Sequence, residues 1–337
     1  MSHVNDEYVL QVEDLTVYYE LEEETVKAVN NISFSLKKGE TIGLVGETGA
    51  GKTTTALALL RLVPDPPGVI KSGKIVVCGN DMMAIPVDKL EKIRGKEISM
   101  IFQDPMTSLN PVFKVVDQIA ESLLLHEELT KEQAHEKALD MLEMVGIARN
   151  RGGEYPHQFS GGMKQRVGIA IALACSPQLL IADEPTTALD VTIQAQVLDL
   201  IKDLKDKHGT SVIMITHDLG IVAEICDKVA VMYAGRIIEA GSLDDVFNHT
   251  LHPYTEGLFN SLPNINDRKA ELKPIPGLMP DPTDLPEGCA CAPRCEYATE
   301  ACNKALPELK NFTGTHMAAC LRYNDPDFHI ARGKKHE

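Results

Sequence analysis

The stretch Gly46-Glu-Thr-Gly-Ala-Gly-Lys-Thr53 decides the fold, because it fits the phosphate-loop pattern GxxxxGK[ST]. It follows an apolar run, Thr41 to Val45, and precedes the helix-compatible run TTALALLRL. In this strand–loop–helix context, glycines let backbone N–H groups curl around phosphate oxygens, and the helix N-terminus adds its positive dipole end. We expect Lys52 to reach the β- and γ-phosphates of a nucleotide and Thr53 to ligate Mg²⁺. The candidate nucleotide-binding residues are Gly46, Glu47, Thr48, Gly49, Ala50, Gly51, Lys52, Thr53 and Thr54.

A second short apolar strand, Leu179 to Ala182, ends in the acid pair Asp183-Glu184. An acid at the carboxyl end of a buried strand beside a phosphate loop stands where Mg²⁺ needs a partner, which is the role we expect of Asp183. Glu184 can polarise a water for in-line attack on the γ-phosphate. An acid pair that merely starts a helix ahead of Pro185 is the alternative interpretation, and a preceding phosphate loop disfavours it.

The periodicity of the chain predicts an α/β fold. Residues 9–19 and 31–45 alternate apolar and polar side chains, which is typical of antiparallel strands. The spacing of apolar residues from about 112 to 150 predicts helices, and Thr130 with Gln133 fits a capping box. After residue 165, helical patterns alternate with short apolar strands, which predicts a parallel sheet with crossover helices. Those strands are expected at 179–182, 211–216 and 229–233.

Charge and length narrow the class of protein. The chain has 337 residues, enough for about two domains, and carries 33 Lys+Arg against 49 Asp+Glu, a formal net charge of −16. This acidity argues against nonspecific binding to DNA or anionic lipid. The longest apolar run, Val167 to Cys175, is too short to span a membrane, and the acidic N-terminus does not fit a signal peptide. We expect a soluble, intracellular protein that other subunits hold at a membrane if it works there.

A change in composition near residue 260 predicts a domain boundary. Prolines become frequent from there to Cys295, and proline at this density excludes regular helix and central strand. We therefore expect a nucleotide-binding domain over 1–260 and an extended C-terminal extension over 261–337.

The segment Phe159-Ser-Gly-Gly-Met-Lys-Gln-Arg166 lies between the two nucleotide motifs. With it the chain resembles the nucleotide-binding subunits of ABC transporters, whose signature sequence it matches as SGGMKQ. The resemblance implies an ABC-type P-loop ATPase with an antiparallel β subdomain and a helical subdomain at about 112–157. It also implies a dimer, in which the signature helix of one chain caps the ATP on the phosphate loop of its partner. The signature residues are Ser160, Gly161, Gly162 and Gln165.

The same resemblance implies roles for single residues. Gln103, in FQDPMTSLNP, takes the Q-loop position, expected to touch Mg²⁺ and the attacking water and to meet the membrane subunit. His217 is the switch histidine, expected to contact the γ-phosphate. Asp190 is the D-loop residue, expected to report across the dimer. Tyr19 fits the aromatic residue that stacks on adenine, with Tyr18 as the alternative.

Further motifs narrow the resemblance. The chain is similar to the ATP-binding subunits of oligopeptide, dipeptide and related nickel ABC importers in four further motifs. These motifs are QDPMTSLNPV, HPYT from His252, IPGLMPDP and GCxCxPRC. This implies ATP-driven peptide uptake at the cytoplasmic face of the cell membrane. The implied partners are a second, non-identical ATPase subunit, two transmembrane permease subunits and an extracytoplasmic peptide-binding protein, with no nucleic acid.

Two alternatives to peptide uptake stay open. Nickel or another solute can be the cargo of the same ATPase. A soluble ABC-type ATPase acting on DNA or ribosomes would share the nucleotide motifs, but such proteins usually fuse two cassettes or insert a long coiled coil. This chain has one cassette and no heptad run.

Five cysteines gather near the C-terminus, and in a reducing cytosol such a cluster is a better candidate for a metal site than for disulfides. The spacing of four of them fits neither the close pairs of zinc ribbons nor the ferredoxin run, so it does not name the metal. The resemblance implies a [4Fe–4S] cluster, with zinc or unmetallated thiols as alternatives. It would serve as a structural or redox-sensing clip, which leaves a chiefly regulatory role for the chain as a third possibility. The four expected ligands are Cys289, Cys295, Cys302 and Cys320, and Cys291 is a possible substitute.

Overall fold

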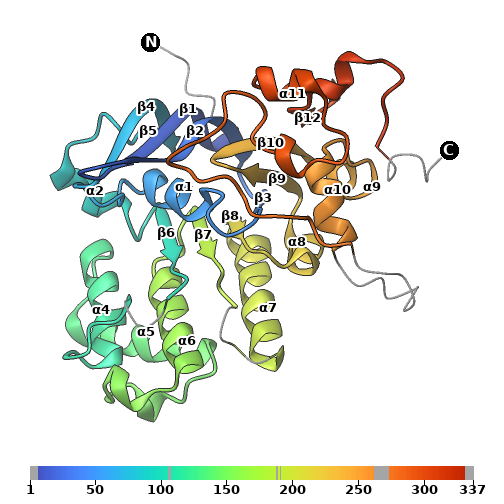
Figure 1. The fold of residues 1–337 in the computed structure, drawn as a ribbon. Coiled ribbons are helices and arrows are strands. Elements are labelled where there is room, and N and C mark those ends of the chain that lie inside the picture. The colour runs from blue at the N-terminus through green and yellow to red at the C-terminus, as the bar shows by residue number, and fades with distance from the viewer. Residues whose placement is uncertain (1–6, 105–107, 187–188, 190, 262–272, 331–337) are drawn as a thin grey trace.

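The central element of the computed structural model is an eight-stranded mixed sheet (Figure 1), found within the residues the structure describes: 7–104, 108–186, 189, 191–261 and 273–330. The strand order is β11-β12-β10-β9-β3-β8-β7-β6. Strands β9, β3, β8, β7 and β6 are parallel, as the sequence predicts for 179–182, 211–216 and 229–233, whereas β10, β12 and β11 are antiparallel. Its strands are β3 (Thr41–Val45), β6 (Ile98–Ile101), β7 (Leu179–Asp183), β8 (Ser211–Ile215), β9 (Lys228–Tyr233), β10 (Arg236–Ser242), β11 (Lys310–Thr313) and β12 (His316–Ala318).

The parallel strands are buried on both faces, which explains their continuous apolar sequences. All residues of β3, β7 and β8 are buried. Because successive side chains point to opposite faces, Leu179 and Ile181 enter one apolar core while Leu180 and Ala182 enter the other. Strands β3, β7 and β8, which end at the candidate nucleotide-binding residues, are therefore held between two apolar cores.

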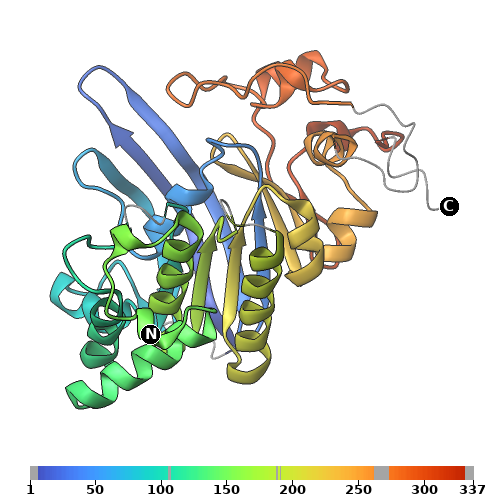
Figure 2. The same ribbon diagram turned by 90° about the horizontal axis from the view of Figure 1, so that it is seen from below.

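A second, antiparallel sheet has the order β2-β1-β4-β5. The blue hairpin of β1 and β2 projects beyond the central sheet in Figure 2. The expected strand over 31–45 was wrong as a single strand, because the chain turns at Gly39, which has a φ of 75°, and enters the central sheet as β3. The strands are β1 (Tyr8–Glu20), β2 (Thr25–Lys37), β4 (Gly68–Val77) and β5 (Asn80–Asp81).

Helices α4, α5 and α6 lie together below the sheet in Figure 1, inside the region where the sequence predicts helices and beyond it. The expected capping box opens α5, since the Thr130 hydroxyl accepts from the Gln133 N–H and the Gln133 side chain accepts from the Thr130 N–H. The helices are α1 (Lys52–Leu59), α2 (Val87–Ile93), α4 (Val115–His126), α5 (Lys131–Met144), α6 (Gly161–Leu173), α7 (Val191–His208), α8 (Leu219–Ile225), α9 (Leu243–Asn248), α10 (Pro253–Asn260) and α11 (Glu300–Lys304).

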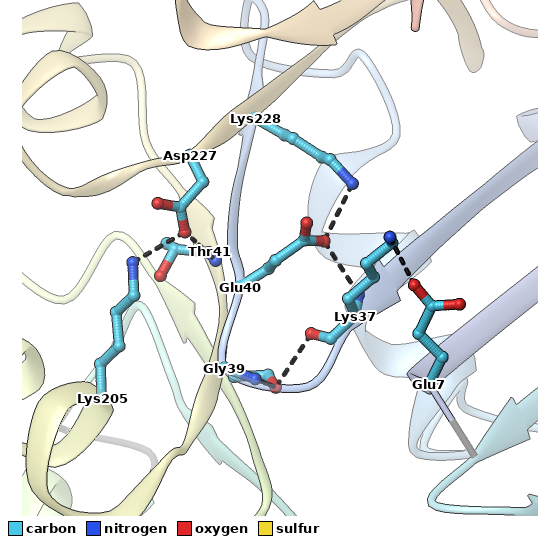
Figure 3. Close-up of polar contacts among 9 residues, drawn as sticks. Glu7, Lys37, Gly39, Glu40, Thr41, Lys205, Asp227 and Lys228 are labelled. Carbon is cyan, nitrogen blue, oxygen red and sulfur yellow. Dashed lines mark hydrogen bonds and ion pairs between the residues drawn. The ribbon is translucent and has the colours of Figure 1, made fainter.

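Polar contacts fix the beginning of β3, the strand that carries the phosphate loop at its other end (Figure 3). The Thr41 N–H donates to Asp227 at 2.7 Å, and Lys205 pairs with the same carboxylate oxygen at 2.7 Å. Glu40 accepts from Lys228 at 2.9 Å and from the Lys37 N–H at 3.0 Å. The turn before β3 is thereby tied to β2 and β9.

Part of the C-terminal segment continues the central sheet. Strand β12 pairs with β10, and β11 pairs with β12. The described part of the proline-rich stretch, 273–299, contains no α-helix or strand, in keeping with its composition. Among the described residues, we find no helix with the length and apolar character needed to cross a membrane.

Candidate functional site

The phosphate loop runs between β3 and α1, at the carboxyl edge of the parallel strands. Gly46 and Gly51 have φ values of 150° and 99°. A Cβ on Gly46 would lie 2.2 Å from the Met232 carbonyl oxygen, and a Cβ on Gly51 would lie 2.3 Å from the Ala28 carbonyl oxygen. Only glycine fits at these two positions. No side chain caps α1, so its first N–H groups stay available to an anion.

Lys52 extends back across this loop. Its Nζ donates to the carbonyl oxygens of Gly46 at 2.7 Å and Glu47 at 2.9 Å. Burial lowers the pKa of Lys52, against the opposing effect of Glu184, Asp183 and Glu47. The amine therefore lies among three carboxylates in the place where a triphosphate would add negative charge.

Asp183, at the end of β7, is a buried carboxylate that makes no hydrogen bond of normal geometry to any residue the structure describes. Both of its oxygens are buried and unpartnered, although the Thr53 hydroxyl is near enough to lower its pKa. The net effect of burial is nonetheless a raised pKa. Hard cations prefer oxygen ligands, so an orphaned carboxylate beside a hydroxyl fits Mg²⁺. This is the pair that the sequence predicts for magnesium.

Glu184 connects the other predicted catalytic residues. Its carboxylate accepts from Gln103 Nε2 at 3.1 Å through Oε2, and its Oε1 lies 3.2 Å from Nδ1 of His217. Glu184 adopts a φ of 45°, a conformation that costs free energy in residues other than glycine, and its N–H donates to the Ile215 carbonyl at 2.8 Å. Two residues from distant parts of the sequence, Gln103 and His217, therefore converge on the Glu184 carboxylate.

Tyr19 lies at the far end of the same site. Its hydroxyl is 3.3 Å from the Thr54 hydroxyl on α1. Its neighbour Tyr18 instead interacts electrostatically with Arg236 on β10. Of the two tyrosines considered for adenine, Tyr19 is thus the one with a contact to the phosphate-loop helix.

The signature segment begins α6. Ser160 is its N-cap and accepts from the Met163 N–H at 3.4 Å, and both Ser160 and Gly161 are exposed. Gln165 is different, because it is only 2% exposed and its Nε2 donates to the carbonyls of Phe102 and Pro185. Its side chain thus joins the segments that carry Gln103 and Glu184. The expected contact of Gln165 with a partner's nucleotide stays a prediction. The expected D-loop residue, Asp190, lies outside the described residues.

Two residues that the sequence analysis did not assign reach the phosphate loop from the C-terminal half. The Glu47 N–H donates to the Tyr254 hydroxyl at 3.1 Å, and Arg294 pairs with the Glu47 carboxylate at 3.1 Å. Tyr254 belongs to the HPYT motif and Arg294 to the CxPRC motif. The signal was therefore present in the sequence, but nothing in it connects these motifs to Glu47.

The C-terminal thiols do not form a site for a single metal ion. Among the residues described, no three His, Cys, Asp or Glu side chains are placed to hold one. The thiols are nevertheless mutually close, because Cys320 interacts electrostatically with Cys289, Cys295 and Cys302. The described residues thus show no arrangement of ligands for the zinc ion that was the alternative to a cluster.

The four expected ligands differ from Cys291 in the hydrogen-bond donors near their sulfur atoms. Backbone N–H groups lower the pKa of the Cys289, Cys295 and Cys320 thiols, although burial raises all three overall. The Thr299 hydroxyl lies 3.5 Å from the sulfur of Cys302. Cys291 is 4% exposed, and burial together with the neighbouring thiols raises its pKa without a backbone donor. Donors to sulfur are common around iron–sulfur ligands, so the four fit such a group better than Cys291 does.

Comparison with known proteins agrees with this geometry. The family described as "ABC transporter" matches residues 29–187, and "Oligopeptide/dipeptide transporter, C-terminal region" matches residues 238–302. The oligopeptide transport ATP-binding protein OppD of Bacillus subtilis is 50% identical over 311 residues, covering 91% of this chain and 87% of that protein. OppD of Salmonella typhimurium is 49% identical over 316 residues, covering 93% of both chains.

Solved structures share the fold. The dimeric post-hydrolysis state of the ATP-binding cassette MJ0796 bound to ADP and Pi has a TM-score of 0.64 and 27% identity, covering 69% of this chain and 98% of that one. CbiO1 from Clostridium perfringens, part of the ABC transporter complex CbiONQ, has a TM-score of 0.59 and 29% identity, covering 72% and 91%. The ATP-binding cassette fold that the sequence predicts is confirmed. The chain belongs to the ABC transporter family of ATP-binding proteins, in the group that carries the oligopeptide/dipeptide transporter C-terminal region.

Proposed function

We propose that this chain is the ATP-hydrolysing subunit of an ABC importer for oligopeptides or dipeptides. The observation that carries the ATPase role is the position of Glu184 between Gln103 and His217, next to Lys52 and Asp183. Glu184 is the group that would hold the attacking water, while its two neighbours orient its carboxylate. Magnesium, held by Thr53 and Asp183 with Gln103 as a further contact, would supply charge neutralisation at the phosphates.

The test of this role is Glu184→Gln, which keeps the side-chain shape and removes the charge. We expect ATP binding to persist and turnover to fall by about a hundredfold or more, in the range that general-base removal produces. In the presence of the second ATPase subunit, ATP-dependent dimers should accumulate, measured by size-exclusion chromatography. Near-normal turnover in this variant would exclude the proposed role of Glu184.

We propose that two such ATP sites form between this chain and a second, non-identical ATPase subunit. The exposed Ser160 and Gly161 at the start of α6 are available to such a partner, and the related MJ0796 cassette is dimeric. The D-loop residue Asp190 belongs to the same proposal. Mixing this chain with a candidate partner should raise turnover above that of either chain alone.

The membrane partners are proposed to bind near the Q-loop, at the cytoplasmic face of the membrane. Phe102, which precedes Gln103, is 40% exposed, and Val112 and Phe113, shortly before α4, are 71% and 54% exposed. Large apolar side chains gathered on a surface are typical of an interaction site. Two permease subunits and an extracytoplasmic peptide-binding protein complete the proposed importer, which involves no nucleic acid.

Peptides are the proposed cargo because the relatives named above are oligopeptide transport proteins and the C-terminal region matches that group. Nickel or another solute remains the second candidate, and uptake of labelled peptide against labelled nickel by the assembled importer separates them. We also propose the division into a nucleotide-binding domain over 1–260, with its helical subdomain at 112–157, and a C-terminal extension over 261–337.

We propose a [4Fe–4S] cluster as the group held by Cys289, Cys295, Cys302 and Cys320. A four-iron cube takes four thiolate ligands, and Cys320 is close enough to interact electrostatically with the other three thiols. The N–H and hydroxyl donors at these four sulfurs support the choice. When bound, the cluster would supply thiolate-to-iron crosslinks and a redox-active centre.

Anaerobic purification with iron, acid-labile sulfide and zinc assays tests the cluster. We expect about four iron and four sulfide per chain, the stoichiometry of the cube. A Cys291→Ser variant should keep them, whereas Cys295→Ser should lose them. One zinc without sulfide, or no metal, would exclude the cluster and leave the ATPase proposal unaffected.

A further inference from the structure

The carboxylate of Glu47, the second residue of the phosphate loop, is paired with a buried arginine from the cysteine-rich segment. Arg294 Nη1 lies 3.1 Å from each Glu47 carboxylate oxygen. The Arg294 side chain is 6% exposed and that of Glu47 is 32% exposed. The pair is therefore shielded on the arginine side, where screening by solvent is weakest.

The backbone of the same residue is fixed as well. The Glu47 N–H donates to the Tyr254 hydroxyl at 3.1 Å, and its carbonyl oxygen accepts from Lys52 at 2.9 Å and from the Ala50 N–H at 3.2 Å. Tyr254 is 2% exposed, so its hydroxyl has little freedom to move. The N–H, the carbonyl oxygen and Oε2 of Glu47 thus each have a hydrogen-bond partner within the protein, and Oε1 lies within ion-pair distance of Arg294.

Arg294 is itself held in place by two other parts of the fold. Its Nε donates to the Pro276 carbonyl at 2.8 Å, and its Nη1 donates to the Tyr233 hydroxyl at 3.3 Å. The guanidinium carbon lies 5.8 Å from the Tyr233 ring, which packs edge-on against the Tyr254 ring at 4.6 Å. The two tyrosines and Arg294 form one buried unit behind the loop.

We propose that Arg294 and Tyr254 are positioning residues for nucleotide binding, because they hold the first turn of the phosphate loop in its binding conformation. This inference rests on the proposed ATPase function. Neither residue belongs to the phosphate loop, so each acts through Glu47. A loop that is ordered beforehand loses less conformational freedom when it binds a ligand, and this gain appears in affinity.

The inference predicts a change in affinity and not in the rate of chemistry. In Arg294→Met, which keeps the length of the side chain, we expect KM and Kd for MgATP to rise about tenfold while kcat stays within about twofold, the pattern of lost binding without lost transition-state contacts. Tyr254→Phe removes only the hydroxyl and should raise KM about threefold. Arg294→Lys keeps the charge and should recover part of the affinity.

A double-mutant cycle tests whether Arg294 acts through Glu47. Glu47→Gln alone should raise Kd for MgATP, and Arg294→Met should add little to it, since both remove the same interaction. Arg322→Met is the matched control, because Arg322 lies in the same segment, packs over the Phe328 ring at 4.7 Å and pairs with Asp325. It should leave Kd unchanged.

The outcomes separate this inference from the proposed function. Binding and turnover of MgATP by the wild type together with unchanged Kd in Arg294→Met would overturn the positioning role alone. A fall in kcat at constant KM would also overturn it. So would equal losses of melting temperature and of MgATP affinity in Arg294→Met and Arg322→Met, because the effect would then be a general loss of stability. Failure of the wild type to bind MgATP would overturn both proposals.

Discussion

Nδ1 of His217 lies 3.2 Å from Oε1 of Glu184, although the two side chains differ greatly in exposure. The histidine side chain is 70% exposed and the glutamate side chain 15%. The carboxylate is thus largely enclosed by the fold, whereas the imidazole is exposed to solvent. This arrangement suits a histidine that contacts the γ-phosphate and a glutamate that holds water.

His217→Ala should lower kcat by about a hundredfold with little change in Kd for MgATP, because it removes a group that orients Glu184. The measurement is phosphate release under saturating ATP. His249→Ala is the control, since His249 is also an exposed histidine beside an acid, Asp244, at 3.8 Å. Equal loss in both variants would contradict a specific role for His217.

Asp183→Asn should separate magnesium binding from stability. Burial raises the pKa of Asp183, so the folded protein binds this proton more tightly than the unfolded chain, and the charged carboxylate costs stability above that pKa. Replacing it by a neutral amide should leave the free energy of unfolding unchanged or raise it by about 1 kcal/mol. The increase in melting temperature that MgATP gives the wild type should disappear. A variant that unfolds at much lower temperature without ligand would show instead that Asp183 is structural.

Acid should destabilise the protein through His252. Burial lowers its pKa to about 4, and its Nδ1 accepts from the Tyr254 N–H at 3.1 Å. Between pH 6.5 and about 4 the unfolded chain therefore binds more protons at this histidine than the folded chain does. The contribution of His252 to the free energy of unfolding is fully present above pH 6.5 and is lost as the pH falls, by about 3 kcal/mol at pH 4. Urea unfolding of the wild type and of His252→Asn at pH 7 and pH 5 measures this. The wild type should lose more stability than the variant, and equal losses would contradict the assignment.

The apolar segment after Gln103 should be needed for assembly and not for ATP turnover by the isolated subunits. Val112 and Val87 are 71% and 69% exposed, but Val87 lies on α2, outside this segment. Val112→Asp should abolish co-purification with the permease subunits, while Val87→Asp should not. Both should keep the ATPase activity of the isolated chain. Loss of assembly in both variants would place the membrane contact elsewhere.

Local patterns predicted where most residues of the candidate nucleotide site lie in the fold. The phosphate loop, Asp183 and Glu184 all follow buried strands, and an apolar run that stops at such residues places them at one edge of a parallel sheet. The division of 31–45 into two strands was missed, because alternation continues across the turn at Gly39. The turn becomes visible only when β3 is seen to pair with β8 and β9.

Contacts between distant segments were outside the reach of sequence patterns. Glu47 and Arg294 are 247 positions apart, and no periodicity relates them. Gln165 belongs to a recognised motif, yet its direction depends on how α6 packs against the Phe102 and Pro185 segments. Charge pairing across such distances is settled by tertiary packing, which a single sequence does not display.

Strand β12 has a consequence for shortened forms of the chain. It covers one edge of β10, and His316 at its start holds the fully buried Glu239 at 2.9 Å. A chain that stops at residue 260, or a nascent chain on the ribosome that has reached only that length, presents β10 as an open edge with unpaired backbone groups. Glu239 then keeps the N–H donors of Leu251 and His252 but loses His316. Open edges recruit other strands, so such a fragment should aggregate. Strands β11 and β12 therefore cover an edge of the central sheet that would otherwise pair with strands of other copies.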